Sequence, residues 1–321
     1  MTAGELHVVF GAGQVGRELA RTLAARGLQV RTVTRTRPEL LPAGVEWRGA
    51  DAADPLSAAA AASGAAVVYQ CLNAPYTQWP QLFPPLQRAV LAAAQDVGAL
   101  LVSLENVYGY GPTGGRPMTE DLPLVATTSK GRARAAMTAE LVASSEAGRA
   151  QIAIGRASDF FGAGVTQSAL GEQVFGKALA GKRADFLGDP DLLHTYSYVP
   201  DIAAGLATLG TDSRAVGQVW HLPGPATVTT REVLAMVSTQ LGRSVSPRTV
   251  PPFVLRVLGL VNPMMREMVE MQYEFTAPFV LDTGKFVGTF GANSTPWETA
   301  VTDTLDWYRA RKGSRERAAT P

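Results

Sequence analysis

The sequence is poor in the residues that build disulfides and metal sites, and it has no long apolar run. A single cysteine, Cys71, excludes an internal disulfide and is typical of a reducing compartment. The three histidines, His7, His194 and His221, are far apart, and no H-x-x-x-H or C-x-x-C spacing occurs, so we expect no dedicated metal site. No apolar run reaches the about 18 residues of a membrane-spanning helix, and Glu5 stands where a signal peptide needs a basic region. We therefore expect a cytoplasmic protein without a membrane partner.

Excess charge is also lacking. The formal net charge of the 321 residues is +1, which gives no electrostatic case for nucleic acid. The one basic stretch lies at the C-terminus, where residues 313–321 are expected to form a flexible tail. The length allows two domains, or one large α/β domain with an inserted lobe.

The clearest positive feature is a glycine-rich turn near the N-terminus. Leu6–Phe10 is a short apolar strand pattern, and it is followed by G-x-G-x-x-G at Gly11, Gly13 and Gly16 and then by apolar residues at helical spacing. In such a turn the first glycine permits the tight bend, the second lets the backbone approach a pyrophosphate, and the third lets the helix pack on the strand. The pattern predicts dinucleotide binding at the N-terminus of that helix.

The residue that would choose the dinucleotide is Arg35, about 20 residues after the last glycine. An acid there would bind the ribose 2′-hydroxyl of NAD. Arg35 and Arg37 instead suit the 2′-phosphate of NADP, because a guanidinium matches phosphate bidentately. A solvated basic loop is the alternative, but the sequence favours NADP(H).

Strand and helix patterns continue to alternate along the first half of the chain. Strands are expected at 45–48, 65–71, 99–104 and 152–156, and helices at 55–63, at 81–97 and after Ser129, which can cap the last of them. Such alternation predicts a doubly wound parallel (Rossmann) sheet with helices on both faces and ligands at the carboxyl ends of the strands.

Beyond residue 157 the alternation fades, which predicts a smaller C-terminal α/β substrate lobe. The nucleotide-binding domain is expected over 1–157 and about 199–222, where 218–222 rejoins the sheet as a strand. The lobe then takes 158–198 and 223–312. A methionine-rich segment, 253–271, has two interpretations: a flexible substrate lid or homodimer face, or an amphipathic helix pair closing the core of the lobe.

Several motifs together resemble the extended short-chain dehydrogenase/reductase superfamily, the NAD(P)-dependent epimerase/dehydratase group, over nearly the whole length. They are the glycine turn, Asp51-Ala52, Val107-Tyr108-Gly109, Arg156 to Gly162 and Tyr198 to Ala203. This resemblance, with the strand ends, gives the expected cofactor-binding residues: Gly11, Gly13, Gln14, Val15, Gly16, Arg35, Arg37, Asp51, Ala52, Asn73, Ala74, Lys130 and Arg156.

The catalytic pair of that family is incomplete in this sequence. In the family a tyrosine four residues before a lysine transfers the proton, and the lysine holds the nicotinamide ribose and lowers the tyrosine pKa. The matching lysine is Lys130, but Ala126 stands where the tyrosine belongs. A literal Tyr-x-x-x-Lys at Tyr308 and Lys312 lies in the terminal basic segment, outside the context the motif needs, and we reject it.

Another phenol is therefore expected to replace the missing tyrosine. In order of preference the candidates are Tyr108, Tyr110 and Tyr76, all at carboxyl ends of predicted strands. The alternative for each is an aromatic ring packed against the cofactor or the lobe, with its hydroxyl satisfied. Ser103 is a further candidate in the position of the family's serine, or it is a strand-end hydroxyl bonded to backbone.

Two functional hypotheses follow from this resemblance. The first is an NADP(H)-dependent oxidoreductase that transfers hydride between nicotinamide and a small, largely apolar carbonyl or alcohol substrate, with an epimerase or dehydratase as a less favoured form of the same chemistry. The second is a non-catalytic NADP(H) sensor resembling NmrA-like redox regulators, which the absence of a tyrosine at position 126 suggests.

Overall fold

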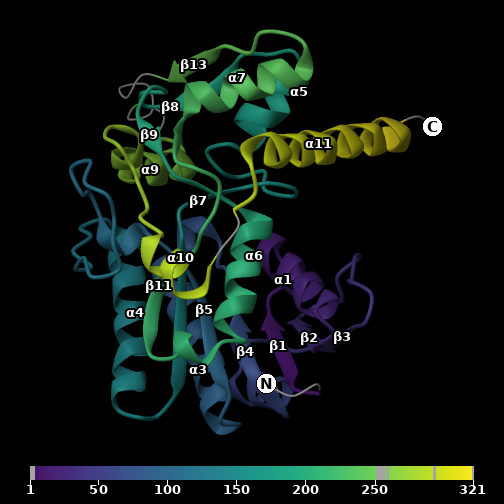
Figure 1. The fold of residues 1–321 in the computed structure, drawn as a ribbon, viewed down its shortest axis with the longest axis vertical. Helices are drawn as coiled ribbons and strands as arrows, with labels where there is room; N and C mark the ends of the chain where they lie inside the picture. The colour runs from purple at the N-terminus through teal and green to yellow at the C-terminus, as the bar shows by residue number, and fades with distance from the viewer. Residues whose placement is uncertain (1–3, 251–256, 258–259, 292–293, 320–321) are drawn as a thin grey trace.

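The computed structural model describes residues 4–250, 257, 260–291 and 294–319. The centre of the molecule is a seven-stranded parallel sheet in the order β3-β2-β1-β4-β5-β6-β11 (Figure 1). The order reverses between β1 and β4, which makes their carboxyl ends the expected ligand crevice of a doubly wound sheet. The strands are β1 (Leu6–Phe10), β2 (Gln29–Thr34), β3 (Val45–Gly49), β4 (Ala65–Gln70), β5 (Leu100–Asn106), β6 (Gln151–Ala157) and β11 (Gln218–His221).

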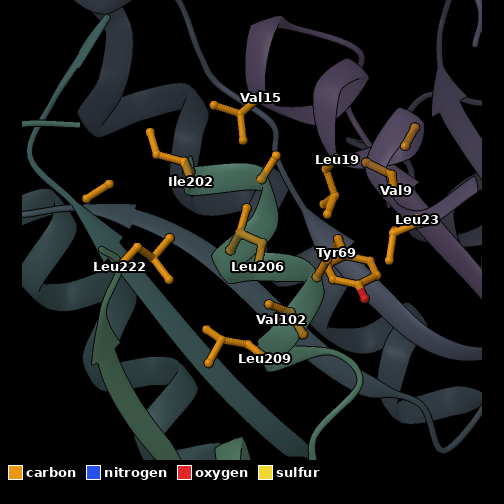
Figure 2. Packing of buried hydrophobic residues seen from close by; sticks show 14 of the residues in the cluster. Val9, Val15, Leu19, Leu23, Tyr69, Val102, Ile202, Leu206, Leu209 and Leu222 are labelled. Atoms are coloured by element: carbon orange, nitrogen blue, oxygen red, sulfur yellow. The ribbon is translucent and has the colours of Figure 1, made fainter. Parts of the chain in front are cut away.

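Helices cover both faces of the sheet, which confirms the predicted α/β fold. One face carries α1 (Gln14–Ala25) and α6 (Val199–Leu209); the other carries α2 (Pro55–Ala62), α3 (Trp79–Asp96) and α4 (Ser129–Glu146). Figure 2 shows apolar side chains of α1 and α6 meeting over the sheet. They recur at helical spacing on each helix: Val15, Leu19 and Leu23 on α1, and Ile202, Leu206 and Leu209 on α6.

The smaller lobe lies at the opposite end of the molecule from the N-terminus (Figure 1). Its helices pack around a second apolar core, in which the Phe161 and Trp297 rings stack with their centroids 4.9 Å apart. Three two-stranded ladders pair β7 (Asp159–Phe161) with β10 (Tyr196–Tyr198), β8 (Ala184–Leu187) with β13 (Pro247–Val250), and β9 (Leu193–His194) with β12 (Val228–Thr229). The helices are η3 (Gly171–Gly176), α5 (Lys177–Leu179), α7 (Thr230–Leu241) and α11 (Trp297–Ala319).

The segment between α7 and α11 connects the two halves. It contains α9 (Pro263–Glu270), η5 (Gln272–Phe275) and α10 (Gly284–Phe290). Although α10 falls in the range predicted for the lobe, its Phe286 is 2% exposed and packs against Trp220 of β11, in the core of the sheet. The aromatic side chains of α10 pack against the edge strand β11. This packing holds α10 against the sheet although the chain has by then left the nucleotide-binding half.

Two local predictions differ from the structure. Thr128, not Ser129, caps α4, because its hydroxyl accepts a hydrogen bond from the Gly131 amide. The predicted tail, 313–321, is helical as far as Ala319, since arginine, glutamate and alanine favour a helix. Of the predicted methionine-rich segment, residues 253–256 and 258–259 lie outside the described residues. No helix among the described residues is both long and apolar enough to span a bilayer.

Candidate active site

The turn between β1 and α1 contains three glycines with different surroundings. At Gly11 the backbone φ is +102°, and a Cβ would lie 2.7 Å from the carbonyl oxygen of Cys71. A Cβ at Gly16 would overlap the carbonyl oxygen of Gly11, so α1 packs directly on its own turn. Gly13 faces open space, with no heavy atom within 4 Å of where a Cβ would stand. The first and third glycines are thus required by packing, and the second leaves a free approach to the backbone.

The N-terminus of α1 has the features of an anion site. Gly13 is its N-cap, and no side chain caps the helix. The first N–H groups of a helix lack partners within it, and the helix dipole favours negative charge there. Gln14 is exposed and donates its side-chain amide to the carbonyl oxygen of Gly164 (3.0 Å), whereas Val15 is 6% exposed in the core and offers a ligand only its backbone. The turn fits a dinucleotide pyrophosphate.

The predicted selectivity residues lie at the end of β2. Arg35 and Arg37 are exposed, and neither forms an ion pair with a described residue. The loop before them is fixed by Thr34, whose hydroxyl donates to the carbonyl of Thr36 (2.7 Å) and accepts from the Trp47 indole (2.9 Å). The Arg37 guanidinium lies 6.0 Å from the centre of the Trp47 ring. Both arginines are available to a ligand.

The ends of the neighbouring strands combine exposed polar side chains with buried alanines. Asp51 follows β3, is exposed and accepts a hydrogen bond from the Ala53 amide (2.9 Å); Asn73 follows β4 and is exposed. Ala52 and Ala74 are 7% and 5% exposed. Each of these two strand ends therefore presents one exposed polar side chain next to a buried alanine.

Lys130, in the first turn of α4, is fully enclosed. Its side chain is 1% exposed, its ammonium lies 4.2 Å above the centre of the Tyr76 ring, and it forms an ion pair with Glu267 of α9. Glu270 lies 4.0 Å away and accepts a hydrogen bond from the Ser129 amide. Burial lowers the pKa of Lys130, and the charge of Glu270 partly offsets this. Helix α9 therefore covers the lysine that the sequence predicted as a cofactor ligand.

Two of the predicted phenols lie together beside this lysine. Tyr76, in η1 (Tyr76–Gln78), and Tyr108, in η2 (Tyr108–Tyr110), are hydrogen-bonded through their side chains. The Trp79 ring lies 5.9 Å from the ring of Tyr108. Burial raises the pKa of both phenols. Tyr76, Tyr108 and Lys130 therefore form one group at the carboxyl ends of β4 and β5.

Ala126, at the position of the missing tyrosine, is tightly packed. It is 8% exposed and lies between Gly111 and Gly131, where a Cβ at Gly131 would overlap its methyl group. Its amide donates to the carbonyl of Gly109 (3.2 Å). The neighbouring residues therefore pack directly against the methyl group of Ala126.

Three other predicted site residues lie outside this group. Arg156 is 3% exposed and donates to Glu105 (3.1 Å) and to the Tyr110 hydroxyl (2.6 Å), so its guanidinium is engaged inside the protein rather than in the crevice. Tyr110 bonds also to His221 (2.7 Å) and is no free acid. Neither placement could be seen in the sequence, because the partners come from distant segments.

Ser103 is also placed away from the crevice. It is fully buried, and its hydroxyl has no hydrogen-bond partner. Leu104 packs with the core of α1 and α6, and Leu101 with the core of α2 to α4. Since side chains alternate along a strand, Ser103 shares the side of Leu101, one residue out of the register that a crevice-facing serine needs.

The sequence reasoning missed four residues that lie near the phenols. Tyr273 and Glu274 belong to η5, and Asp159 of β7 pairs with His194 of β9 at 2.9 Å. The charges of Glu274 and Asp159 act on both Tyr76 and Tyr108. A lone glutamate between aromatic residues, in Tyr273-Glu274-Phe275, was the available signal. We call Tyr76, Tyr108, Tyr273 and Glu274 the tyrosine–glutamate cluster.

Comparison with known proteins places these features in a wider group. The sequence model of the NAD dependent epimerase/dehydratase family matches residues 7–222, more than half of the chain. No curated protein matches the sequence significantly. Within the described residues, no three histidine, cysteine, aspartate or glutamate side chains are grouped to hold a metal ion.

Several solved structures share the fold. Epimerase Mth375 from Methanothermobacter thermautotrophicus has a TM-score of 0.79 and 16% identity, covering 98% of this chain and 95% of that chain. The dTDP-glucose 4,6-dehydratase of Bacillus anthracis, in complex with NAD, has a TM-score of 0.78 and 14% identity over 96% and 98%. The UDP-glucose 4-epimerase of Thermus thermophilus, in complex with NAD, has a TM-score of 0.74 and 20% identity over 95% and 99%. At these identities the likeness shows the fold.

Proposed function

Because the chain belongs to the NAD-dependent epimerase/dehydratase family, we propose that it is an enzyme that uses a nicotinamide dinucleotide to oxidise or reduce a small, largely apolar alcohol or carbonyl substrate. The observation that carries this proposal is the open, uncapped glycine turn at Gly13, with the Lys130 group at the adjacent strand ends. A dinucleotide held at the turn would extend along the carboxyl ends of the strands toward Lys130.

The preferred cofactor in this proposal is NADP(H). The similar dehydratase and epimerase structures hold NAD, but here the end of β2 presents Arg35 and Arg37, exposed and without ion pairs to described residues. A guanidinium binds the 2′-phosphate of NADP and offers nothing comparable to a ribose hydroxyl.

The protein's own part in the reaction is to move a proton. A bound nicotinamide supplies or accepts the hydride. Tyr108 and Tyr76 share a hydrogen bond, and burial raises the pKa of both, so this pair is suited to donate the accompanying proton to an alkoxide that forms beside it.

The experiment that tests the proposal is turnover of a broad panel of small carbonyl compounds with saturating NADPH. We expect activity in the natural protein and a loss of about 100-fold or more in kcat/KM in Tyr108→Phe and Lys130→Met. Exposed Glu172→Gln, on the lobe, is the control. Binding of NADPH without turnover of any compound, together with no change in the two variants, would contradict an enzymatic role.

The cofactor choice is tested separately by binding. Arg35→Ala is expected to weaken NADPH binding by about 10-fold or more and to leave NADH binding nearly unchanged, because only NADPH carries the phosphate that the guanidinium bonds. Arg88→Ala, an exposed arginine on α3, is the matched control. Equal losses for both nucleotides would disprove the NADP preference.

A sensor is the second candidate, favoured by Ala126 and by the ion pair that engages Lys130. A non-catalytic sensor has no need of a free lysine or a family tyrosine. It would separate NADP⁺ from NADPH strongly in affinity and would change its oligomeric state or its binding to a partner with occupancy. Similar affinities for NADP⁺ and NADPH, together with turnover of a carbonyl substrate, would instead favour the enzyme.

A further inference from the structure

Two acidic side chains of α9 lie against the first turn of α4. Glu267 forms the ion pair with the Lys130 ammonium, and Glu270 accepts a hydrogen bond from the Ser129 amide and lies 4.0 Å from the same ammonium. Residues three apart in a helix are neighbours on one face, so a single face of α9 brings both carboxylates to this point. The two glutamate side chains are 23% and 24% exposed, whereas that of Lys130 is 1% exposed.

Because Lys130 is enclosed, a ligand can reach its ammonium only if a neighbouring segment moves. One neighbour is the Tyr76 ring of the tyrosine–glutamate cluster, 4.2 Å from the ammonium. Tyr76 packs edge-on against Trp79, with the ring centroids 5.4 Å apart, and Trp79 is itself 6% exposed. This side of the lysine is therefore fixed by aromatic packing, and the other neighbour is α9.

Helix α9 buries little of its own surface. None of its residues 265–270 is buried, and residues 260–262, which precede it, are exposed. Firm packing begins after the helix, at Met271, which is 4% exposed, and at Phe275, which stacks on His194 with the ring planes 5° apart. A segment with few buried contacts opens locally at a low cost in free energy. We therefore expect α9 to leave α4 by turning about Met271, while η5 stays in place.

The cations of α4 favour the closed position of α9. Arg134 follows Lys130 by one turn of the helix and is 5% exposed. Its guanidinium donates to Asn106 Oδ1 (3.3 Å) and to the carbonyl of Leu104 (3.2 Å), lies 4.8 Å from the centre of the Phe83 ring, and leaves its Nη1 without a hydrogen bond. Two positive charges on one face of α4 attract the carboxylates of α9.

We propose that α9 is an autoinhibitory gate, which Glu267 and Glu270 hold closed over Lys130 and which turns away when the nicotinamide end of a dinucleotide binds at this lysine. This inference rests on the proposed function. The two glutamates are positioning residues, because they control access to Lys130 and take no part in the transfer of hydride or proton. Only the open fraction of the protein binds, so the closed position weakens the apparent affinity for the cofactor.

Hydrogen exchange followed by mass spectrometry on the full-length protein tests the gate directly. An isolated helix of eight residues is not stable in water, so the amides of residues 265–270 should exchange about 10-fold faster or more once α9 has left α4. We expect this change on addition of saturating NADPH. The amides of Phe279 and Leu281, which are bonded to Leu193 and Thr195, are the internal control and should not change.

A charge-neutral variant tests the acids that hold the gate. Glu267→Gln/Glu270→Gln keeps the size of both side chains and leaves Lys130 without its ionic partner, which destabilises the closed position. We expect faster exchange of residues 265–270 without nucleotide and NADPH binding about 10-fold tighter, measured by fluorescence titration. Glu172→Gln/Glu298→Gln, which removes two acids from the lobe, is the matched control and should bind as the natural protein does.

Each outcome has a definite meaning. NADPH binding that slows the exchange of α9, or leaves it unchanged, overturns the gate and leaves the proposed function intact. Equal or weaker NADPH binding by the α9 double variant also overturns the gate, because the two acids would then not compete with the cofactor. Opening of α9 by NADPH without turnover of any carbonyl compound overturns the enzymatic proposal and leaves the gate standing. Failure of both proteins to bind NADPH overturns both.

Discussion

At the scale of single residues, one set of buried polar side chains forms hydrogen bonds within the protein without any ligand. Glu105, Arg156, Tyr110 and His221 form a continuous buried network. His221 Nδ1 lies 2.8 Å from the Asp282 carbonyl oxygen, so it donates there and its Nε2 accepts from the Tyr110 hydroxyl. The network is complete without a ligand, which is why we assign it to structure.

This network predicts a pH dependence of stability. Burial lowers the pKa of His221 from 6.5 to about 4. The unfolded chain therefore takes up a proton at a higher pH than the folded protein, and the free energy of unfolding falls as pH drops from about 6.5 to about 4. The loss attributable to His221 approaches about 3 kcal/mol at the lower limit. Urea unfolding at several pH values measures it.

The variant His221→Gln isolates this contribution. Its side chain keeps a donor and an acceptor but does not titrate, so its unfolding free energy should fall less between pH 6.5 and 4 than that of the natural protein. Parallel curves for the two proteins would show that the protonation of His221 is not coupled to folding.

Residue identity predicted only part of the site. Gly11, Gly13, Gly16 and Lys130 could be proposed from the sequence because the motifs that contain them are local. The engagement of Arg156 by Glu105, 51 residues away, could not, nor could the position of Glu274 beside two phenols. Such contacts depend on tertiary packing, and a single sequence carries no local signal for them.

At the scale of elements, two glycines of the β1–α1 turn allow the effect of a substitution on stability to be measured apart from its effect on cofactor binding. Gly16→Ala forces a methyl group into the Gly11 carbonyl oxygen, and such overpacking costs about 1–3 kcal/mol. Gly13→Ala places its methyl group in open space and should change stability by less than about 1 kcal/mol. The same methyl group would meet a bound pyrophosphate, so we expect NADPH binding to weaken by about 10-fold or more.

Urea unfolding and NADPH fluorescence titration measure the two effects independently. The matched pair differs only in which glycine receives the methyl group. If Gly13→Ala binds NADPH as well as the natural protein does, then the phosphates do not lie on this turn.

The elements themselves were largely predictable, since each depends on local periodicity. The strands predicted at 6–10, 45–48, 65–71, 99–104, 152–156 and 218–222 correspond closely to β1, β3, β4, β5, β6 and β11, and the helices predicted at 55–63 and 81–97 correspond to α2 and α3. The end of α11 differed because its composition favours a helix where charge suggested a tail. The cap of α4 shifted by one residue between two adjacent hydroxyl side chains, Thr128 and Ser129.

At the scale of the whole molecule, the sheet could be predicted and the lobe only in outline. Parallel β-α alternation leaves few topologies for the first half. In the lobe the two strands of a ladder are far apart in the sequence, as with β8 and β13 or β9 and β12. The sequence pattern around either strand does not indicate its partner. The contact of α9 with Lys130, which covers the candidate active site, belongs to this unpredictable class.

The chain passes several times between the nucleotide-binding half and the lobe, and this order limits how the two parts can be exchanged. The chain leaves the sheet after β6, returns for α6 and β11, leaves again, and returns for α10 before ending in α11. Because Trp220 and Phe286 pack together from opposite sides of a long lobe segment, no single cut divides the sequence into two pieces that each keep a whole core. A single crossover within the sequence would therefore divide one of the two cores between different parents, and the lobe cannot be exchanged in this way without disturbing the contact of Trp220 with Phe286.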